Sequence, residues 1–82
     1  MKAKEVEKVV HTDPFKPFRL VLQDGEEIVV RRPRKAHVSG DQVALVGECR
    51  RPGGATFERF RMLSVDRVTS AENVELPIRD RR

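Results

Sequence analysis

The sequence predicts a mainly β fold, in which an N-terminal helix is followed by a small, partly open barrel or a strongly bent antiparallel sheet of four to five strands. From Phe18 onward, apolar residues recur at every second position in several short segments, which is the spacing of half-buried strands. Turn residues separate these segments at intervals of about 8 to 12 residues, which is typical of small barrels. Because a few strands bury one face only by curling, we expect the sheet to roll up. An open sheet with the helix across it is the alternative arrangement.

The length of 82 residues allows one domain. We expect this domain to span residues 1–78, with a charged tail at residues 79–82. A chain of this size buries only roughly 60 to 65% of the surface that its unfolded form exposes, so its core must be compact. Such a core leaves no room for a deep substrate cavity, and the sequence therefore favours a protein that is not an enzyme.

Three features predict a cytoplasmic protein without membrane contact. The longest wholly apolar runs extend over only a few residues, so no segment is long enough to span a bilayer. The segment 1–10 is charged throughout and lacks the apolar stretch of a signal peptide. A single cysteine, Cys49, excludes an internal disulfide, and disulfides are typical of oxidising compartments.

Residues 3–11 are predicted to form a short amphipathic helix. Its apolar side chains recur at spacings of three and four, the pattern of one helix face, and are Ala3, Val6, Val9 and Val10. Valine is a poor helix former, so this helix should be stable only when the apolar stripe packs against the rest of the domain. The helix should end near Thr12, because Asp13 precedes a proline and that position disfavours helical backbone.

An extended lead-in follows, because Pro14 and Pro17 fix the backbone around Phe15. The first strand then alternates apolar residues with others, and its apolar residues are Phe18, Leu20 and Leu22. After Asp24-Gly25, a second strand carries Ile28 and Val30 on one face and Glu27 and Val29 on the other. The two segments are therefore predicted to form a hairpin.

The loop of this hairpin determines which residues face each other. A two-residue loop would pair Leu20 with Val29 and mix apolar with charged side chains on the core face. A three-residue loop, residues 23–25, sets Leu20 opposite Ile28 and Phe18 opposite Val30. It also places a glycine, Gly25, where left-handed backbone is required. We predict the three-residue loop.

Further turns divide the rest of the chain. Pro33 interrupts the second strand, so residues 31–35 should lie at a strand end, a bulge or an edge. Residues 39–41, Ser-Gly-Asp, form a turn between two alternating segments, and after it Val43 and Leu45 should share one face.

The segment 50–54, Arg-Arg-Pro-Gly-Gly, is the strongest loop signal. It precedes a strand over residues 57–63 that we expect to be half-buried. Leu63, Val65 and Val68 should end the core, with a single helical turn near residues 64–67. Beyond Ala71, the alternation of Val74, Leu76 and Ile78 indicates either an edge strand or a loose tail.

The chain carries 17 basic and 13 acidic residues, a formal net charge of +4. The candidate binding residues for nucleic acid or another polyanion are the densest basic stretch and a second doublet: Arg31, Arg32, Arg34, Lys35, Arg50 and Arg51. Acidic neighbours such as Glu26, Glu27 and Asp41 dilute their field. The alternative is a solvated basic edge strand, since charge and proline on an edge discourage association between sheets.

No catalytic or metal-binding constellation emerges from the sequence. His11 and His37 are far apart along the chain, and neither has a metal-type partner nearby. Cys49 stands beside two arginines, which favour a thiolate, but the alternative is a small apolar residue at a strand end. Gly53-Gly54 lacks the lysine and hydroxyl residue that complete a phosphate-binding loop. We therefore expect no catalytic residues, no metal and no cofactor.

One stretch carries a resemblance to known proteins. The run of residues 14–46, PFKPFRLVLQDGEEIVVRRPRKAHVSGDQVALV, closed by residues 65–72, resembles a family of small uncharacterised bacterial proteins with a Pro-Phe-x-Pro-Phe lead-in and a strand ending in Leu-x-Asp-Gly. Together with the helix it covers over half of the chain, and it implies relatedness without a known activity.

A helix followed by a strand ending in Asp-Gly is also distantly similar to the start of Sm-like RNA-binding barrels and to SH3-like small barrels. The segment 60–63, Phe-Arg-Met-Leu, lacks the glycine and histidine of the second Sm signature, so this similarity carries over no RNA pocket.

Two functional hypotheses follow. The first is a non-enzymatic binding module whose basic stretch at residues 31–35 contacts RNA or DNA. The second is a protein-interaction or assembly domain that uses an exposed strand edge or the valine-rich helix.

Overall fold

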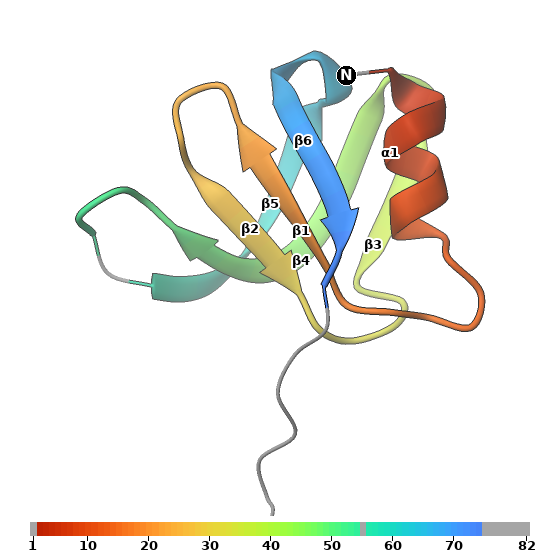
Figure 1. The fold of residues 1–82 in the computed structure, drawn as a ribbon, viewed down its shortest axis with the longest axis horizontal. Coiled ribbons are helices and arrows are strands. Elements are labelled where there is room, and N and C mark those ends of the chain that lie inside the picture. The colour runs from red at the N-terminus through yellow and green to blue at the C-terminus, as the bar shows by residue number, and fades with distance from the viewer. Residues whose placement is uncertain (1, 55, 75–82) are drawn as a thin grey trace, which may run out of the picture.

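The computed structural model describes residues 2–54 and 56–74. One helix opens this part of the chain and six antiparallel strands follow (Figure 1). The elements are α1 (Ala3–Val10), β1 (Phe18–Leu22), β2 (Glu27–Val30), β3 (Ala36–Ser39), β4 (Gln42–Arg50), β5 (Thr56–Ser64), the 3-10 turn η1 (Val65–Arg67) and β6 (Val68–Asn73). The strands form an open, strongly curled sheet, a half-barrel, which confirms the predicted fold class. The sheet has six strands in the described residues, where four to five were predicted.

The long strand β4 organises the sheet. On one edge its first half pairs with β3 and its end pairs with β2, while β5 pairs along the whole of its other edge. The strand order is β3, β4, β2, β1, β6, with β5 beside β4. Figure 1 shows the end of β4 and the turn that follows it projecting beyond β2.

Gly47 lies where β4 changes its partner from β3 to β2. A Cβ atom at this position would lie 2.8 Å from the backbone oxygen of Val29 and 3.0 Å from Cγ2 of Val30. No side chain fits in that space, so the glycine allows β2 to approach β4 at the bend.

The first hairpin has the predicted register. Phe18 faces Val30 and Leu20 faces Ile28. The N–H of Leu22 donates to the carbonyl of Glu26 at 2.8 Å, which closes a loop of residues 23–25. Gly25 has a φ of 89°, the left-handed backbone that the three-residue loop requires. The parity of the apolar residues therefore determined the loop length correctly.

The second turn also lies where the sequence places it. Ser39 pairs with Gln42, and Gly40 between them has a φ of 61°. Val43 and Leu45 are buried, while Ala44 on the other face is partly exposed. The predicted helical turn is η1, and its first residue, Val65, is buried.

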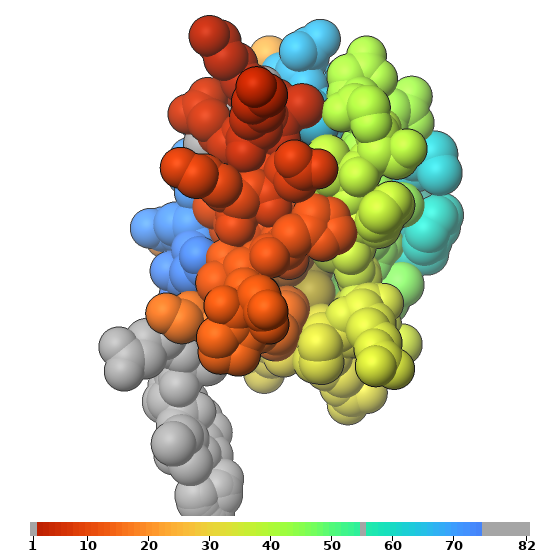
Figure 2. Space-filling view, turned by 90° about the vertical axis from the view of Figure 1, so that its right-hand side faces the viewer, coloured from red at the N-terminus to blue at the C-terminus, as the bar shows by residue number. Residues whose placement is uncertain are grey.

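The helix closes the open side of the half-barrel. Val6 and Val10 are buried, and Val9 packs partly buried against the core, so the predicted apolar stripe faces inward. Figure 2 shows α1 lying between β6 and β3. The Asn73 amide donates to the carbonyl of Val9 at 3.3 Å, which ties β6 to the helix. In the described part of the chain, no helix has the length and apolar character needed to cross a membrane.

In the later part of the chain, one strand was not predicted from the sequence and the predicted burial of another was wrong. The sequence does not predict β6, because its residues Val-Thr-Ser-Ala-Glu-Asn do not alternate, but pairing with β1 stabilises it as a strand. The segment 57–63 is more exposed than half-buried, since nothing in the described residues covers most of β5. Leu76, Ile78 and the predicted tail at 79–82 lie outside the described residues.

Candidate functional site

The predicted basic stretch is the connection between β2 and β3. Arg31, Arg32, Arg34 and Lys35 are all exposed there, at the end of a strand as expected. The carbonyl of Lys35 accepts the N–H of Val46 at 2.7 Å, which fastens the connection to β4. The loop therefore holds its cations beside the outer face of the sheet, the face opposite the core.

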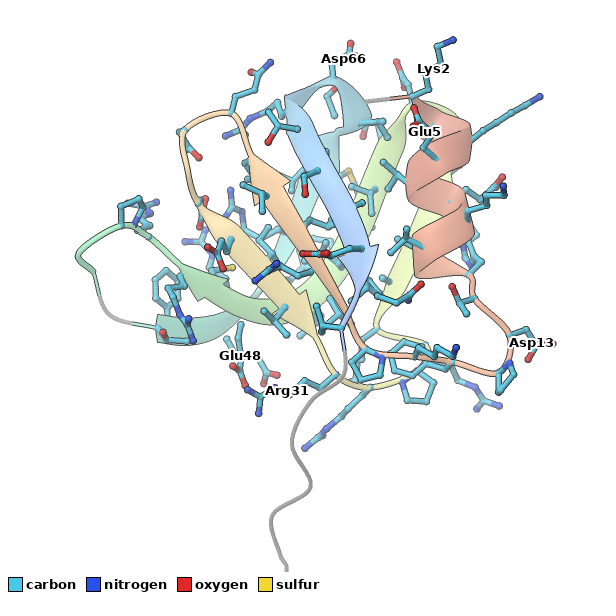
Figure 3. The ribbon with its side chains drawn as sticks, in the orientation of Figure 1. Lys2, Glu5, Asp13, Arg31, Glu48 and Asp66 are labelled. Carbon is cyan, nitrogen blue, oxygen red and sulfur yellow. The ribbon has the colours of Figure 1, made fainter. Side chains whose placement is uncertain are left out.

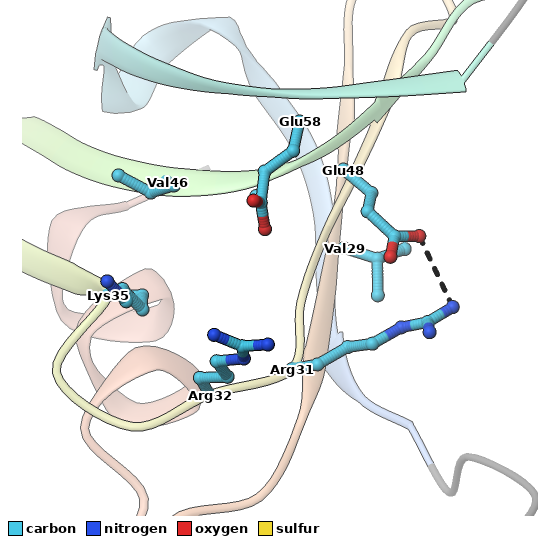
Figure 4. Close-up of a pocket in the computed structure, with 8 residues that line it drawn as sticks. Val29, Arg31, Arg32, Lys35, Val46, Glu48 and Glu58 are labelled. Atoms are coloured by element: carbon cyan, nitrogen blue, oxygen red, sulfur yellow. Dashed lines mark ion pairs between the residues drawn. The ribbon is translucent and has the colours of Figure 1, made fainter.

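Acidic side chains share the space with these cations. Arg31 forms an ion pair with Glu48, with 3.2 Å between Nη2 and Oε1, and Figure 3 shows the two side chains next to each other. Figure 4 shows Glu48 and Glu58 pointing from β4 and β5 toward Arg31 and Arg32. Together with Lys35 and three residues of the floor, they line a recess of about 140 Å³. The recess is a mixed-charge site rather than a purely cationic one.

Arg50 and Arg51 belong to a separate place on the surface. Arg50 faces Glu27 at the start of β2, whereas Arg31 follows the end of β2, so about 13 Å of strand separates them. The Nε atom of Arg50 lies 3.4 Å from Oγ1 of Thr56, and Nε of Arg51 lies 3.9 Å from the Glu26 carboxylate. The six candidate basic residues therefore do not form one continuous surface.

A buried ion pair lies beneath Arg51, and the sequence reasoning missed it. Glu26 is 2% exposed, and its Oε2 atom accepts a hydrogen bond from Nη1 of Arg61 at 2.7 Å. This hydrogen bond raises the pKa of the Arg61 guanidinium above its ordinary value, so the arginine stays charged. Strand parity could have found the pair, because position 26 shares the inward parity of Ile28 and Val30.

Cys49 lies inside the fold. Its side chain is fully buried, and Sγ lies 3.8 Å from both Nη1 of Arg61 and the carbonyl of Gly47. A thiol without exposed surface fits the small apolar residue of the sequence analysis better than a reactive nucleophile.

His11 and His37 come together although they are distant in sequence. Their ring centroids are 5.4 Å apart in an edge-to-face arrangement. Nε2 of His11 accepts the N–H of Val38 at 3.3 Å, so this nitrogen links the end of α1 to β3. Within residues 2–54 and 56–74, no group of three or more His, Cys, Asp or Glu side chains is placed to hold a metal ion.

Strand β5 carries large apolar side chains that are exposed to solvent. Phe60 is 60% exposed and Met62 is 61% exposed, both on the outer face, where they pair across the strands with Val46 and Ala44. Phe57, on the other face of β5, is 39% exposed. Large apolar side chains that cluster on a surface are typical of interaction sites.

A shallow groove runs along the outer face of β4 beside Phe60 and Met62. One hollow of about 310 Å³ lies next to Phe60 and a second of the same volume lies next to Met62. They share His37 and Ala44 in their linings, and the first continues into the mixed-charge recess through Lys35 and Val46. We call this continuous feature the β4 groove.

The strand β5 also has an edge without a partner. Among the described residues it pairs only with β4, over nine positions, so its other edge carries unpaired backbone groups. We call this the open edge of β5. The end strands β3 and β6 differ from it, because α1 packs against both. An exposed edge with apolar side chains beside it is the arrangement that accepts an added strand.

No family model matches the chain, and comparisons with curated proteins and with solved structures found no match either. The resemblance to a family of uncharacterised bacterial proteins and the similarity to Sm-like barrels therefore stay predictions.

Proposed function

We propose that this chain is a non-enzymatic binding module that holds a segment of another protein along β5. The observation that carries the proposal is the pair Phe60 and Met62, both more exposed than buried, on a strand with an open edge. Burying two such side chains supplies a favourable hydrophobic term, and strand addition supplies main-chain hydrogen bonds.

The α1 helix and the basic connection between β2 and β3 are weaker candidates for a surface that binds another protein. The valine stripe of α1 is turned into the core through Val6 and Val10, and Val9 is partly buried, so the stripe offers little apolar surface to a partner. The basic connection carries charge, but Glu48 and Glu58 share its recess. Among the described residues, the large apolar side chains that are exposed, Phe57, Phe60 and Met62, all belong to β5.

The proposal is tested by selecting displayed random nonapeptides on the full chain. We expect selected peptides to shift the NMR amide signals of β5 and to lose binding to the double variant Phe60→Ser, Met62→Ser. The matched control is Val21→Ser, which removes apolar surface from the outer face of β1. If no peptide is selected, or if selected peptides bind the double variant as well as they bind the control, the proposal is wrong.

A second candidate function is the binding of RNA or DNA by the β2–β3 connection. It is supported by Arg32, Arg34 and Lys35, which are exposed and lie beyond ion-pair distance of every acidic group in the described residues. Phosphate contacts by these three residues would give binding that weakens steeply with salt.

This candidate is tested by titrating a labelled oligonucleotide at several salt concentrations. Changing all three residues to glutamine should lower the slope of log affinity against log salt by about 2 to 3. Arg50→Gln with Arg51→Gln removes charge at the other end of β2 and should leave the slope unchanged. An oligonucleotide that does not bind at low salt would eliminate this function.

A further inference from the structure

We propose that the segment received by β5 is an antiparallel strand with the pattern apolar, any residue, apolar, acidic, basic. This rests on the proposed function, because it specifies the partner of the same strand. The pattern follows from the side chains that β5 presents along its open edge, which differ between the two faces of the strand.

On the outer face, β5 presents Glu58, Phe60 and Met62 in succession. On the other face it presents Arg59 and Arg61. Arg61 is already neutralised by the buried Glu26. Arg59 is exposed, its guanidinium carbon lies 5.7 Å from the centre of the Phe57 ring, and within the described residues no carboxylate lies within ion-pair distance of it.

Residues directly opposite each other in neighbouring strands project to the same face and contact each other. An added strand therefore meets Phe60 and Met62 with apolar side chains at two positions separated by one residue. The next residue toward its C-terminus lies opposite Arg59, where a carboxylate is favoured. The residue after that lies opposite Glu58, where a cation is favoured.

A second copy of the chain is a poorer occupant of the same edge. In a symmetric antiparallel pairing of two β5 strands centred on residue 59, 60 or 61, an arginine of one copy always lies opposite an arginine of the other: Arg59 with Arg59, Arg59 with Arg61, or Arg61 with Arg61. A pairing centred on Glu58 brings two glutamates together. Like charges directly opposite destabilise a strand pair, so the edge disfavours pairing with itself in these four registers.

The test compares two synthetic peptides of identical composition. The matched peptide is Thr-Thr-Val-Thr-Val-Glu-Lys-Thr-Thr, and the swapped peptide exchanges Glu and Lys. We expect the matched peptide to bind the full chain about tenfold more tightly at low salt, because two attractive cross-strand pairs become repulsive in the swapped one. The difference should shrink at 1 M salt, since these charges are exposed.

Two variants test whether Arg59 causes the preference for the matched peptide. Arg59→Gln should reduce the ratio between the two affinities, whereas Arg67→Gln, the same loss of charge in η1 and outside the positions that the peptide pairs with, should leave it unchanged. Equal binding of both peptides, or an unchanged ratio in Arg59→Gln, would overturn the charge pattern.

The remaining outcomes separate the two proposals. If neither peptide binds while display selects other peptides on β5, the pattern is wrong and the proposed function stands. If display also selects nothing, both fail. A dimer in sedimentation experiments that Phe60→Ser with Met62→Ser abolishes would replace the peptide by a second copy of the chain.

Discussion

The Glu26 carboxylate lies 2.7 Å from the Arg61 guanidinium, and 35 positions of sequence separate the two residues. The glutamate directly precedes β2 and the arginine belongs to β5, two strands that both pair with β4 and not with each other, so the ion pair connects them across the inner face of the curled sheet. The Arg61 side chain is only 13% exposed, which shields the pair from water.

The first prediction concerns this pair. Glu26→Gln should lower the free energy of unfolding by about 3 kcal/mol, because it leaves a largely buried guanidinium without its counter-charge. The variant Glu27→Gln, one residue later on the outer face, should change it by less than about 0.5 kcal/mol. Urea denaturation measures both. Equal effects at the two positions would show that the pair contributes no specific stability.

The pair also allows a double-mutant cycle. Glu26→Leu combined with Arg61→Met removes both charges and should cost less than the sum of the single changes. If the double variant loses as much stability in urea denaturation as the two single variants together, the two side chains do not interact.

The second prediction concerns the bend of β4. Gly47→Ala should destabilise the fold by about 1 to 3 kcal/mol, because the added carbon would lie 2.8 Å from the backbone oxygen of Val29. Gly54→Ala is the control, since its added carbon would meet its closest neighbour, Cβ of Arg51, at 3.4 Å. Thermal unfolding of the two variants gives the comparison, and a Gly47→Ala protein as stable as Gly54→Ala would refute the close approach.

The third prediction contrasts two phenylalanines. Phe18→Ala should cost about 3 to 5 kcal/mol, because Phe18 is fully buried in the core. Phe60→Ala should change the free energy of unfolding by less than about 0.5 kcal/mol, since most of that ring already contacts water. A large loss of stability in Phe60→Ala would mean that the ring supports the fold rather than a partner.

The fourth prediction concerns self-association. Arg59→Glu should promote pairing of two β5 strands centred on Phe60, because each new carboxylate would lie opposite Arg61 of the other copy. Sedimentation equilibrium should detect more dimer than in the unchanged protein, while Arg67→Glu, with the same charge change elsewhere, should show none of this increase. Equal association of the two variants would contradict the proposed role of charge at the open edge.

Much of the first hairpin was predictable because its register depends on local information. The alternation of apolar residues and a glycine that tolerates left-handed backbone are both readable in a short segment. The exposure of the basic residues between β2 and β3 was also predictable from a short segment, because Pro33 interrupts the strand there. The division of the six candidate basic residues into two separate places was not, because it depends on β2 lying between them.

Sequence patterns were enough to predict which side chains share a face in the strands between Phe18 and Ser64, the apolar stripe of α1 and the turn glycines. They were not enough to predict how deeply each face is buried. The predicted features depend on residues a few positions apart. By contrast, the enclosure of Phe18, the exposure of Phe60 and the contact of Arg61 with Glu26 depend on how distant segments pack together. An alternating pattern shows that a strand has two different faces, but the packing of distant segments decides which of them is covered.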